Sequence, residues 1–178
     1  MEEYIVKDGR KLRLGYTTGT CAAAAAKAAA WMLLTGQRKE KIGIDTPKGI
    51  HLDLDVREIT IGGNKVSCAI EKDSGDDPDI TNGMEIRTRV EMLPEEGEIR
   101  FLAGEGVGII TEPGLKIPVG EPAINPVPRQ MIEEAIRSVY GSRAGNVTVS
   151  IPGGRELARR TFNRTLFNRR HRKQEGTV

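Results

Sequence analysis

Leu14-Gly15-Tyr16-Thr17-Thr18-Gly19-Thr20-Cys21, followed directly by Ala22-Ala23-Ala24-Ala25-Ala26-Lys27, is the stretch that decides how the fold begins. Threonine is a favourable N-cap residue and alanine has the highest helix propensity, so this stretch predicts a helix start. The predicted helix runs from about Thr20 to Leu34 and ends at Gly36, because glycine commonly follows the last helical turn. The pattern leaves open which threonine is the cap.

Length and composition indicate a small globular protein. The chain has 178 residues, which is one domain, or one domain and part of a second. Only 38% of the residues are hydrophobic and 4% are aromatic, so the core must consist mainly of Ala, Ile, Leu and Val. No apolar run reaches the roughly 20 residues that span a bilayer, and the charged N-terminus does not resemble a signal peptide. We therefore expect a cytoplasmic protein in which Cys21 and Cys68 are reduced.

Charge is distributed unevenly along the chain. From Arg155 onward, eight Lys and Arg stand against two Glu, a net charge of +6, which leaves −4 on residues 1–154. Basic segments can bind nucleic acid or acidic partners. This one has no interleaved aromatic residues and no recognised nucleic-acid motif, so we expect no nucleic-acid partner. We predict that residues 164–178 form a solvated, disordered tail.

The segments after the first helix predict a series of strands. His51–Val56 alternates between apolar and polar residues, as a half-buried strand does. Gly62-Gly63-Asn64 separates two strand-like segments and predicts a hairpin. The expected strands are Lys41–Ile44, His51–Val56, Glu58–Ile61, Val66–Ile70, Met84–Met92, Glu98–Ala103 and Asn146–Ile151.

A second helix is expected from Asn125-Pro126 to about Tyr140, because Asn is a good cap and Pro suits the first turn. The strands that follow the first helix, from Lys41 to Ala103, would form an antiparallel meander. Strands that are grouped rather than alternating with helices predict an α+β fold. We expect a two-layer sandwich, with the helices packed on one face of a mostly antiparallel sheet.

Four aspartates, Asp73, Asp76, Asp77 and Asp79, lie within the stretch Lys72–Thr81. Three interpretations are open. Carboxylate oxygens suit Mg²⁺, although the spacing is not that of an EF-hand. Neighbouring carboxylates also raise one another's pKa, as a general base requires. The third interpretation is an Asx-rich turn with solvated charges. The two histidines and two cysteines lie far apart, so we expect no zinc site.

Residues 104–129 contain five glycines and five prolines, which excludes regular structure over most of the stretch. Long ordered loops in compact domains are commonly functional. Ala103–Thr111 resembles a phosphate-binding loop but lacks the Lys and Ser/Thr of a P-loop. Glu112-Pro113-Gly114 prevents the helix that a dinucleotide-binding turn requires. We expect the glycines to let the backbone approach a ligand or a neighbouring strand.

Four motifs in this order resemble the cobalt-precorrin-5B C1-methyltransferases of the anaerobic cobalamin pathway. They are LGYTTGTCAAAAAK (Leu14–Lys27), KDSGDDPDIT (Lys72–Thr81), GEGVGIITEPGLKIPVGEPAINPVPR (Gly104–Arg129) and VSIPGGRELARRTFN (Val149–Asn163). Each motif is long and unusual in composition, and together they extend over about residues 10–163. The ordered set is therefore much more specific than any single motif.

The resemblance implies transfer of a methyl group from S-adenosyl-L-methionine (SAM) to C-1 of a cobalt-containing corrin precursor, giving cobalt-precorrin-6A. The corrinoid carries acetate and propionate arms, which would suit hydroxyls and free N–H groups at a helix start. The expected substrate-binding residues are Thr17, Thr18, Thr20, Gly104, Gly106, Gly108, Thr111 and Asn125. The candidate catalytic residues are the four aspartates, although the family supplies no established catalytic residue.

The sequence departs from the family after Thr161-Phe162-Asn163. Family members continue there into a glycine-rich stretch and a second α/β domain, whereas residues 164–173 are basic here. We predict that residues 1–163 form the N-terminal α+β domain of the family and that the C-terminal domain is absent. The alternative to an enzyme is a non-catalytic corrinoid-binding domain that lacks the methyl-donor site.

Overall fold

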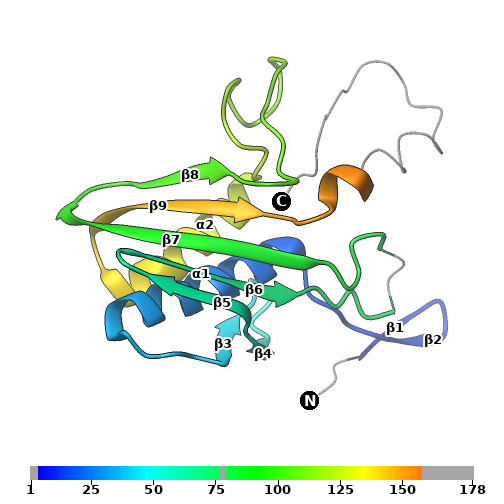
Figure 1. The fold of residues 1–178 in the computed structure, drawn as a ribbon. Coiled ribbons are helices and arrows are strands. Elements are labelled where there is room, and N and C mark those ends of the chain that lie inside the picture. The colour runs from blue at the N-terminus through cyan, green and yellow to red at the C-terminus, as the bar shows by residue number, and fades with distance from the viewer. Residues whose placement is uncertain (1–3, 77–78, 158–178) are drawn as a thin grey trace.

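A computed structural model describes residues 4–76 and 79–157, and its centre is a five-stranded sheet (Figure 1). The strand order is β5-β6-β7-β9-β8. Two separate hairpins, β1–β2 and β3–β4, complete the strands of the described residues. The bounds are β1 Tyr4–Lys7, β2 Arg10–Arg13, β3 Lys41–Asp45, β4 His51–Asp55, β5 Arg57–Gly62, β6 Lys65–Glu71, β7 Glu85–Glu96, β8 Ile99–Ala103 and β9 Arg143–Ser150.

Two helices, α1 (Thr18–Thr35) and α2 (Pro126–Tyr140), pack on the same face of this sheet (Figure 1). All strand pairs are antiparallel except β8 and β9. The predicted α+β sandwich, with helices on one face of a mostly antiparallel sheet, is therefore confirmed. Among the described residues, neither helix combines the length and apolar character needed to cross a membrane. The predicted tail, 164–178, lies outside the described residues.

Helix α1 is the centre of the core because its alanines leave almost no side chain between its backbone and its neighbours. Twelve of its 18 residues are buried, as expected for a helix that is apolar all round. The Sγ of Cys68 donates to the carbonyl of Ala25, and Oγ1 of Thr88 donates to that of Ala22, each at 3.1 Å. Gly36 ends the helix with a φ of 69°, as predicted.

Along the strands of the sheet, residues that face the helices alternate with residues on the opposite face. On β6, Val66, Cys68 and Ile70 are buried beneath the helices, and Val147 and Val149 continue this surface on β9. The intervening residues are mostly polar and face away from the helices, as in antiparallel sheets with one solvated face. This alternation confirms the strand periods that the sequence indicated.

The predicted meander is wrong in two places. Strands β3 and β4 form a separate hairpin and do not continue into the five-stranded sheet, and one edge of that sheet is not a meander. Instead of pairing with β7, strand β8 pairs in parallel with β9, which lies between β7 and β8. A parallel pair requires a crossover connection, and α2 provides it here. The β1–β2 hairpin was also not predicted, because its short strands are exposed and carry little apolar alternation. Helix α1 begins two residues earlier than expected, at Thr18.

Candidate functional site at the helix starts

Thr17 caps the first turn of α1. This answers which of the three threonines is the N-cap residue, a question that the sequence left open. Oγ1 of Thr17 accepts the N–H of Thr20, and its carbonyl accepts that of Cys21, each at 3.1 Å. In the described part of the chain, no acceptor binds the N–H groups of Thr18 and Gly19. Because a helix N-terminus carries partial positive charge, these two groups can bind an anion.

The three threonines differ in accessibility. Thr17 is exposed and Thr18 is half-buried, whereas Thr20 is only 2% exposed. The hydroxyl of Thr20 lies 3.1 Å from that of Thr17. Thr17 and Thr18 can therefore contact a ligand directly, while Thr20 supports the cap from inside the fold.

The segment before α1 crosses the aspartate-rich segment in direct backbone contact. The N–H of Tyr16 donates to the carbonyl of Asp73 at 2.8 Å. A Cβ atom at Gly15 would lie 2.1 Å from the backbone carbon of Ser74, so a larger residue does not fit. Two of the motifs singled out in the sequence are therefore a single structural unit.

Asp73 is held by an ion pair with Arg13. The two terminal nitrogens of Arg13 donate to the two carboxylate oxygens of Asp73 at 2.7 and 2.8 Å. Oδ1 of Asp73 also accepts the N–H of Gly75 at 2.8 Å. The hydrogen bond from Arg13 is the main reason that the pKa of Asp73 is lowered. A carboxylate with both oxygens engaged and a low pKa is a poor general base.

Asp79 is held in the same way by Lys72 and Thr81. Nζ of Lys72, which is nearly buried, lies 2.6 Å from Oδ2 of Asp79. The N–H and hydroxyl of Thr81 donate to Oδ1 at 2.8 and 2.6 Å. Burial favours a raised pKa for Asp79, but these hydrogen bonds outweigh it and lower the pKa to about 2. Asp79 therefore stays ionised and paired at neutral pH.

The other two aspartates of this segment are Asp76 and Asp77. Asp76 is exposed, and its Oδ2 accepts the backbone N–H of Arg13 at 2.7 Å. Asp77 lies outside the described residues. Within residues 4–76 and 79–157, no group of three or more His, Cys, Asp and Glu side chains is arranged to hold a metal ion.

Tyr16 and Cys21 remain protonated at neutral pH. Burial is the main cause of a rise in the pKa of Tyr16 to about 12, and the Tyr16 hydroxyl donates to the carbonyl of Glu71 at 3.1 Å. Burial likewise raises the pKa of Cys21 to about 12, despite the nearby Lys72. A buried thiol with so high a pKa is a structural group rather than a nucleophile.

The glycines after β8 allow close contact with a strand. A Cβ at Gly104 would lie 2.0 Å from Oγ of Ser150, at the end of β9. Gly106 has a φ of +74°, and a Cβ there would lie 2.1 Å from the carbonyl oxygen of Ile151. Of the two uses that the sequence left open, the approach to a strand is therefore present in the fold.

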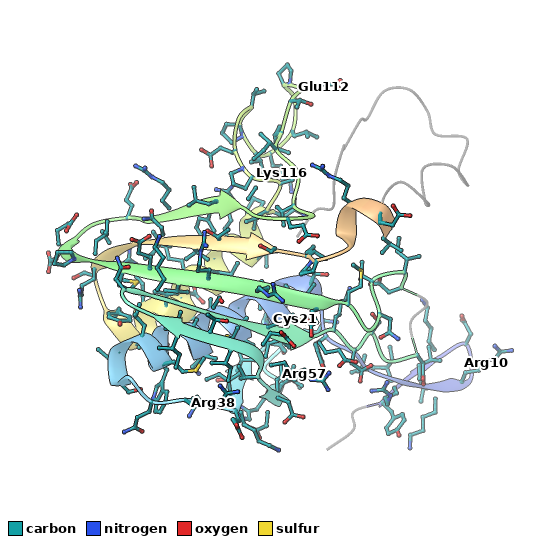
Figure 2. The ribbon with its side chains drawn as sticks, in the orientation of Figure 1. Arg10, Cys21, Arg38, Arg57, Glu112 and Lys116 are labelled. Atoms are coloured by element: carbon teal, nitrogen blue, oxygen red, sulfur yellow. The ribbon has the colours of Figure 1, made fainter. Side chains whose placement is uncertain are left out.

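Residues 109–121, called the arm from here on, project beyond the edge strand β8 (Figure 1). At the base of the arm, the carbonyl of Gly108 accepts the N–H of Ala123 at 2.8 Å. Thr111 is exposed and precedes Glu112, which Figure 2 shows at the far tip, well separated from Cys21 in the first turn of α1. The arm therefore holds Thr111 away from the helix starts.

The starts of the two helices meet at one end of the molecule. A Cβ at Gly19 of α1 would lie 2.9 Å from Cγ of Pro128 of α2, so the two first turns are in contact. Asn125 occupies the N-cap position of α2, but its exposed side chain makes no capping hydrogen bond. The fold thus brings Asn125, which is far away in sequence, to the same end of the molecule as Thr17 and Thr18.

A hollow of about 430 Å³ lies beside the aspartate-rich segment. The sequence did not predict most of its lining residues. Tyr16, Lys72 and Asp73 do lie within the motifs, and Arg13 lies directly before the first one. The lining residues are Arg13, Tyr16, Asp53, Leu54, Asp55, Arg57, Ile70, Glu71, Lys72, Asp73, Asn82 and Gly83. This lining is mostly charged and does not fit an adenine ring, which protein pockets enclose mainly with apolar side chains.

One solved structure resembles this chain in both fold and sequence. The crystal structure of the cobalamin biosynthesis protein (cbiD) from Archaeoglobus fulgidus superposes with a TM-score of 0.58 and 31% sequence identity. The match covers 90% of this chain and 51% of that protein. Fold and sequence therefore agree in this comparison.

A statistical model of the CbiD family matches residues 5–167, so the chain belongs to the CbiD family. The cobalt-precorrin-5B C(1)-methyltransferases of Thermoanaerobacter sp. (strain X514) and Alkaliphilus metalliredigens are 52% and 53% identical to it. Both matches cover 93% of this chain, but only 45% and 44% of the relatives. The chain thus spans about half the length of the curated relatives it matches, and the resemblance seen in the four motifs is confirmed.

Proposed function

We propose that this chain acts in the SAM-dependent methylation of C-1 of cobalt-precorrin-5B, in the cytoplasm, and that its own part is to bind and orient the corrinoid. The observation that carries this proposal is the 52% identity, over 93% of the chain, to a relative of that name. Methyl transfer requires the attacking carbon and the donor methyl group to be held in line, so orientation supplies much of the rate.

The helix starts are the proposed site for a carboxylate arm of the substrate. The unpaired N–H groups of Thr18 and Gly19 and the exposed hydroxyl of Thr17 suit a carboxylate, and the start of α2 adds a second helix dipole. We include Asn125 in this site because its amide is exposed and unused by the helix cap. Contributions by Thr20, the three glycines and Thr111 stay predictions.

We propose that Asp73 and Asp79 hold the loop in place rather than accept a proton. Each has a lowered pKa and a paired carboxylate. Asp76 is exposed, so it remains the described aspartate that is best placed to contact a substrate. No step is assigned to Asp77.

One observation favours a narrower function, that of a corrinoid-binding part without a methyl-donor site. The chain spans about half of its curated relatives, and the hollow beside the aspartates has a charged lining that does not suit the adenine ring of a methyl donor. In that case the methyl donor would bind residues of the longer relatives that have no counterpart here.

Calorimetric titration of SAM into the folded chain separates the two functions. Saturable binding, together with transfer of a labelled methyl group to cobalt-precorrin-5B, supports the complete reaction. Corrinoid binding without SAM binding supports the narrower function. If neither ligand binds to a chain whose circular dichroism shows it to be folded, both proposals are wrong. Thr18→Pro removes an N–H of the proposed site at the first helical position, where proline is tolerated, and should weaken corrinoid binding. Thr60→Ala, at an exposed residue on β5, should not.

A further inference from the structure

The arm is held in shape by a small core of its own. Ile110 and Ile117 are 5% and 7% exposed and form a separate apolar cluster with Ala123. The N–H of Ile110 donates to the carbonyl of Glu121, and the N–H of Gly120 donates to that of Ile110, at 2.9 and 2.8 Å. The arm is therefore an ordered structure, although it contains neither a helix nor a strand.

Prolines make this shape less costly to maintain. Pro113, Pro118 and Pro122 lie in or beside the arm, and each restricts the backbone of the unfolded chain. A long segment without regular structure otherwise pays a large entropic cost for order. A preorganised segment binds a partner with less further loss of entropy.

The arm also presents apolar side chains to solvent. Ile109, Leu115 and Val119 are 48%, 48% and 54% exposed. The charged residues Glu112 and Lys116 alternate with them in sequence, and Figure 2 shows Glu112 at the tip of the arm and Lys116 nearer to β8. The arm therefore exposes three large aliphatic side chains on one short projecting segment, and exposed apolar groups gathered in one place are a feature of protein docking surfaces.

The last described residues lie beside the base of the arm. Ile151 donates its N–H to the carbonyl of Glu105 at 2.7 Å, and the Cα of Gly154 would lie 3.3 Å from a Cβ at Gly106. Figure 1 shows the turn at residues 154–157 beside the start of the 104–125 segment. The family match ends at residue 167, ten residues after the last described residue, 157, so a segment that follows it in the longer relatives is tethered within a short reach of the arm.

From these observations, we propose that the arm is a docking element for the polypeptide that follows this region in the longer members of the family. Its occupant is a protein surface with an apolar patch that covers Ile109, Leu115 and Val119. The position of residues 151–154 beside the base of the arm and the relatives' additional length favour this occupant over a second copy of the chain. This inference is independent of which ligand the helix starts bind.

Hydrogen exchange measured by mass spectrometry tests the proposal on existing proteins. Exchange is followed at the arm in this chain and at the corresponding segment of the full-length Thermoanaerobacter relative, without SAM or corrinoid. Protection factors, rather than rates, correct for the sequence differences. We expect protection of the arm, relative to that of β7, to be at least about tenfold higher in the relative.

Each other outcome overturns the proposal. Equal relative protection in the two proteins would mean that nothing docks on the arm. Protection that rises with the concentration of this chain would assign the arm to a second copy. Because no ligand is present, failure of methyl transfer has no effect on this result, and the reverse also holds.

Discussion

The aspartate-rich segment, residues 72–83, and the arm are both irregular segments that carry family motifs, yet the fold treats them in opposite ways. The aspartate-rich segment is fixed to its surroundings by the Arg13–Asp73 ion pair and by backbone contact at Gly15, and the Lys72–Asp79 pair holds it together internally. The arm contacts the body at its base and exposes its apolar residues. Charge in a motif therefore serves internal structure here, while apolar residues in a loop mark a surface that is free to bind.

The largest loss of stability is expected from a substitution that blocks the close backbone contact between Gly15 and the aspartate-rich segment. In Gly15→Ala, the new Cβ would lie 2.1 Å from the Ser74 carbon and 2.4 Å from the Gly75 nitrogen. Backbone atoms cannot move aside as a side chain can, so we expect a loss of about 3 kcal/mol or more in the free energy of unfolding. Urea denaturation measures this loss.

Gly62→Ala is the matched control, because nothing lies within 4 Å of a Cβ at that position. It should change stability by less than about 0.5 kcal/mol. Equal stability of the two variants would show that the two segments do not cross in contact.

The sequence predicted the fold well where a local rule acts. The alanine block, Gly36 and the alternation of His51–Val56 each depend on neighbours in sequence, and each was confirmed. The parallel pairing of β8 with β9 depends on how α2 returns to the sheet. No local pattern encodes that choice, so the sequence favoured a simple meander.

The candidate site was predicted less completely, for a physical reason. Thr17 and Thr18 could be found because capping is local. The partner of Asp73 lies 60 residues earlier, and Arg13 carried no signal of its own in the sequence. The chemistry of an aspartate depends on its partner. The sequence therefore could not show whether an aspartate is a general base or a carboxylate held in an ion pair.

A somewhat smaller effect is expected from breaking the second ion pair. Lys72→Met leaves Asp79 without its cation in a partly buried position, which should cost about 2 kcal/mol in the free energy of unfolding. Lys41→Met is the control, because the pair between Lys41 and Asp55 is 3.6 Å long and largely exposed. If both variants lose the same stability in urea denaturation, the pair at Lys72 is no stronger than a surface pair.

The same pair should give stability a dependence on pH. The pKa of Asp79 falls from 3.8 to about 2 on folding, so its stabilisation is present above about pH 4 and is lost as pH falls toward 2. The stability difference between wild type and Asp79→Asn should therefore be largest at pH 7 and shrink below pH 4. Denaturation at several pH values measures it, and a difference that stays constant down to pH 2 would contradict the assignment.

The smallest effect is expected from substitutions in the arm, where a buried and an exposed side chain can be compared. Ile117→Ala removes a buried side chain from the arm's small cluster, which should speed hydrogen exchange across residues 109–121 by about tenfold. Leu115→Ser alters a side chain that is 48% exposed and should leave both exchange and overall stability unchanged. A similar response in the two variants would mean that Leu115 is packed in this chain. Its exposure would then be no sign of a docking surface, and the contrast between the two motif segments would disappear.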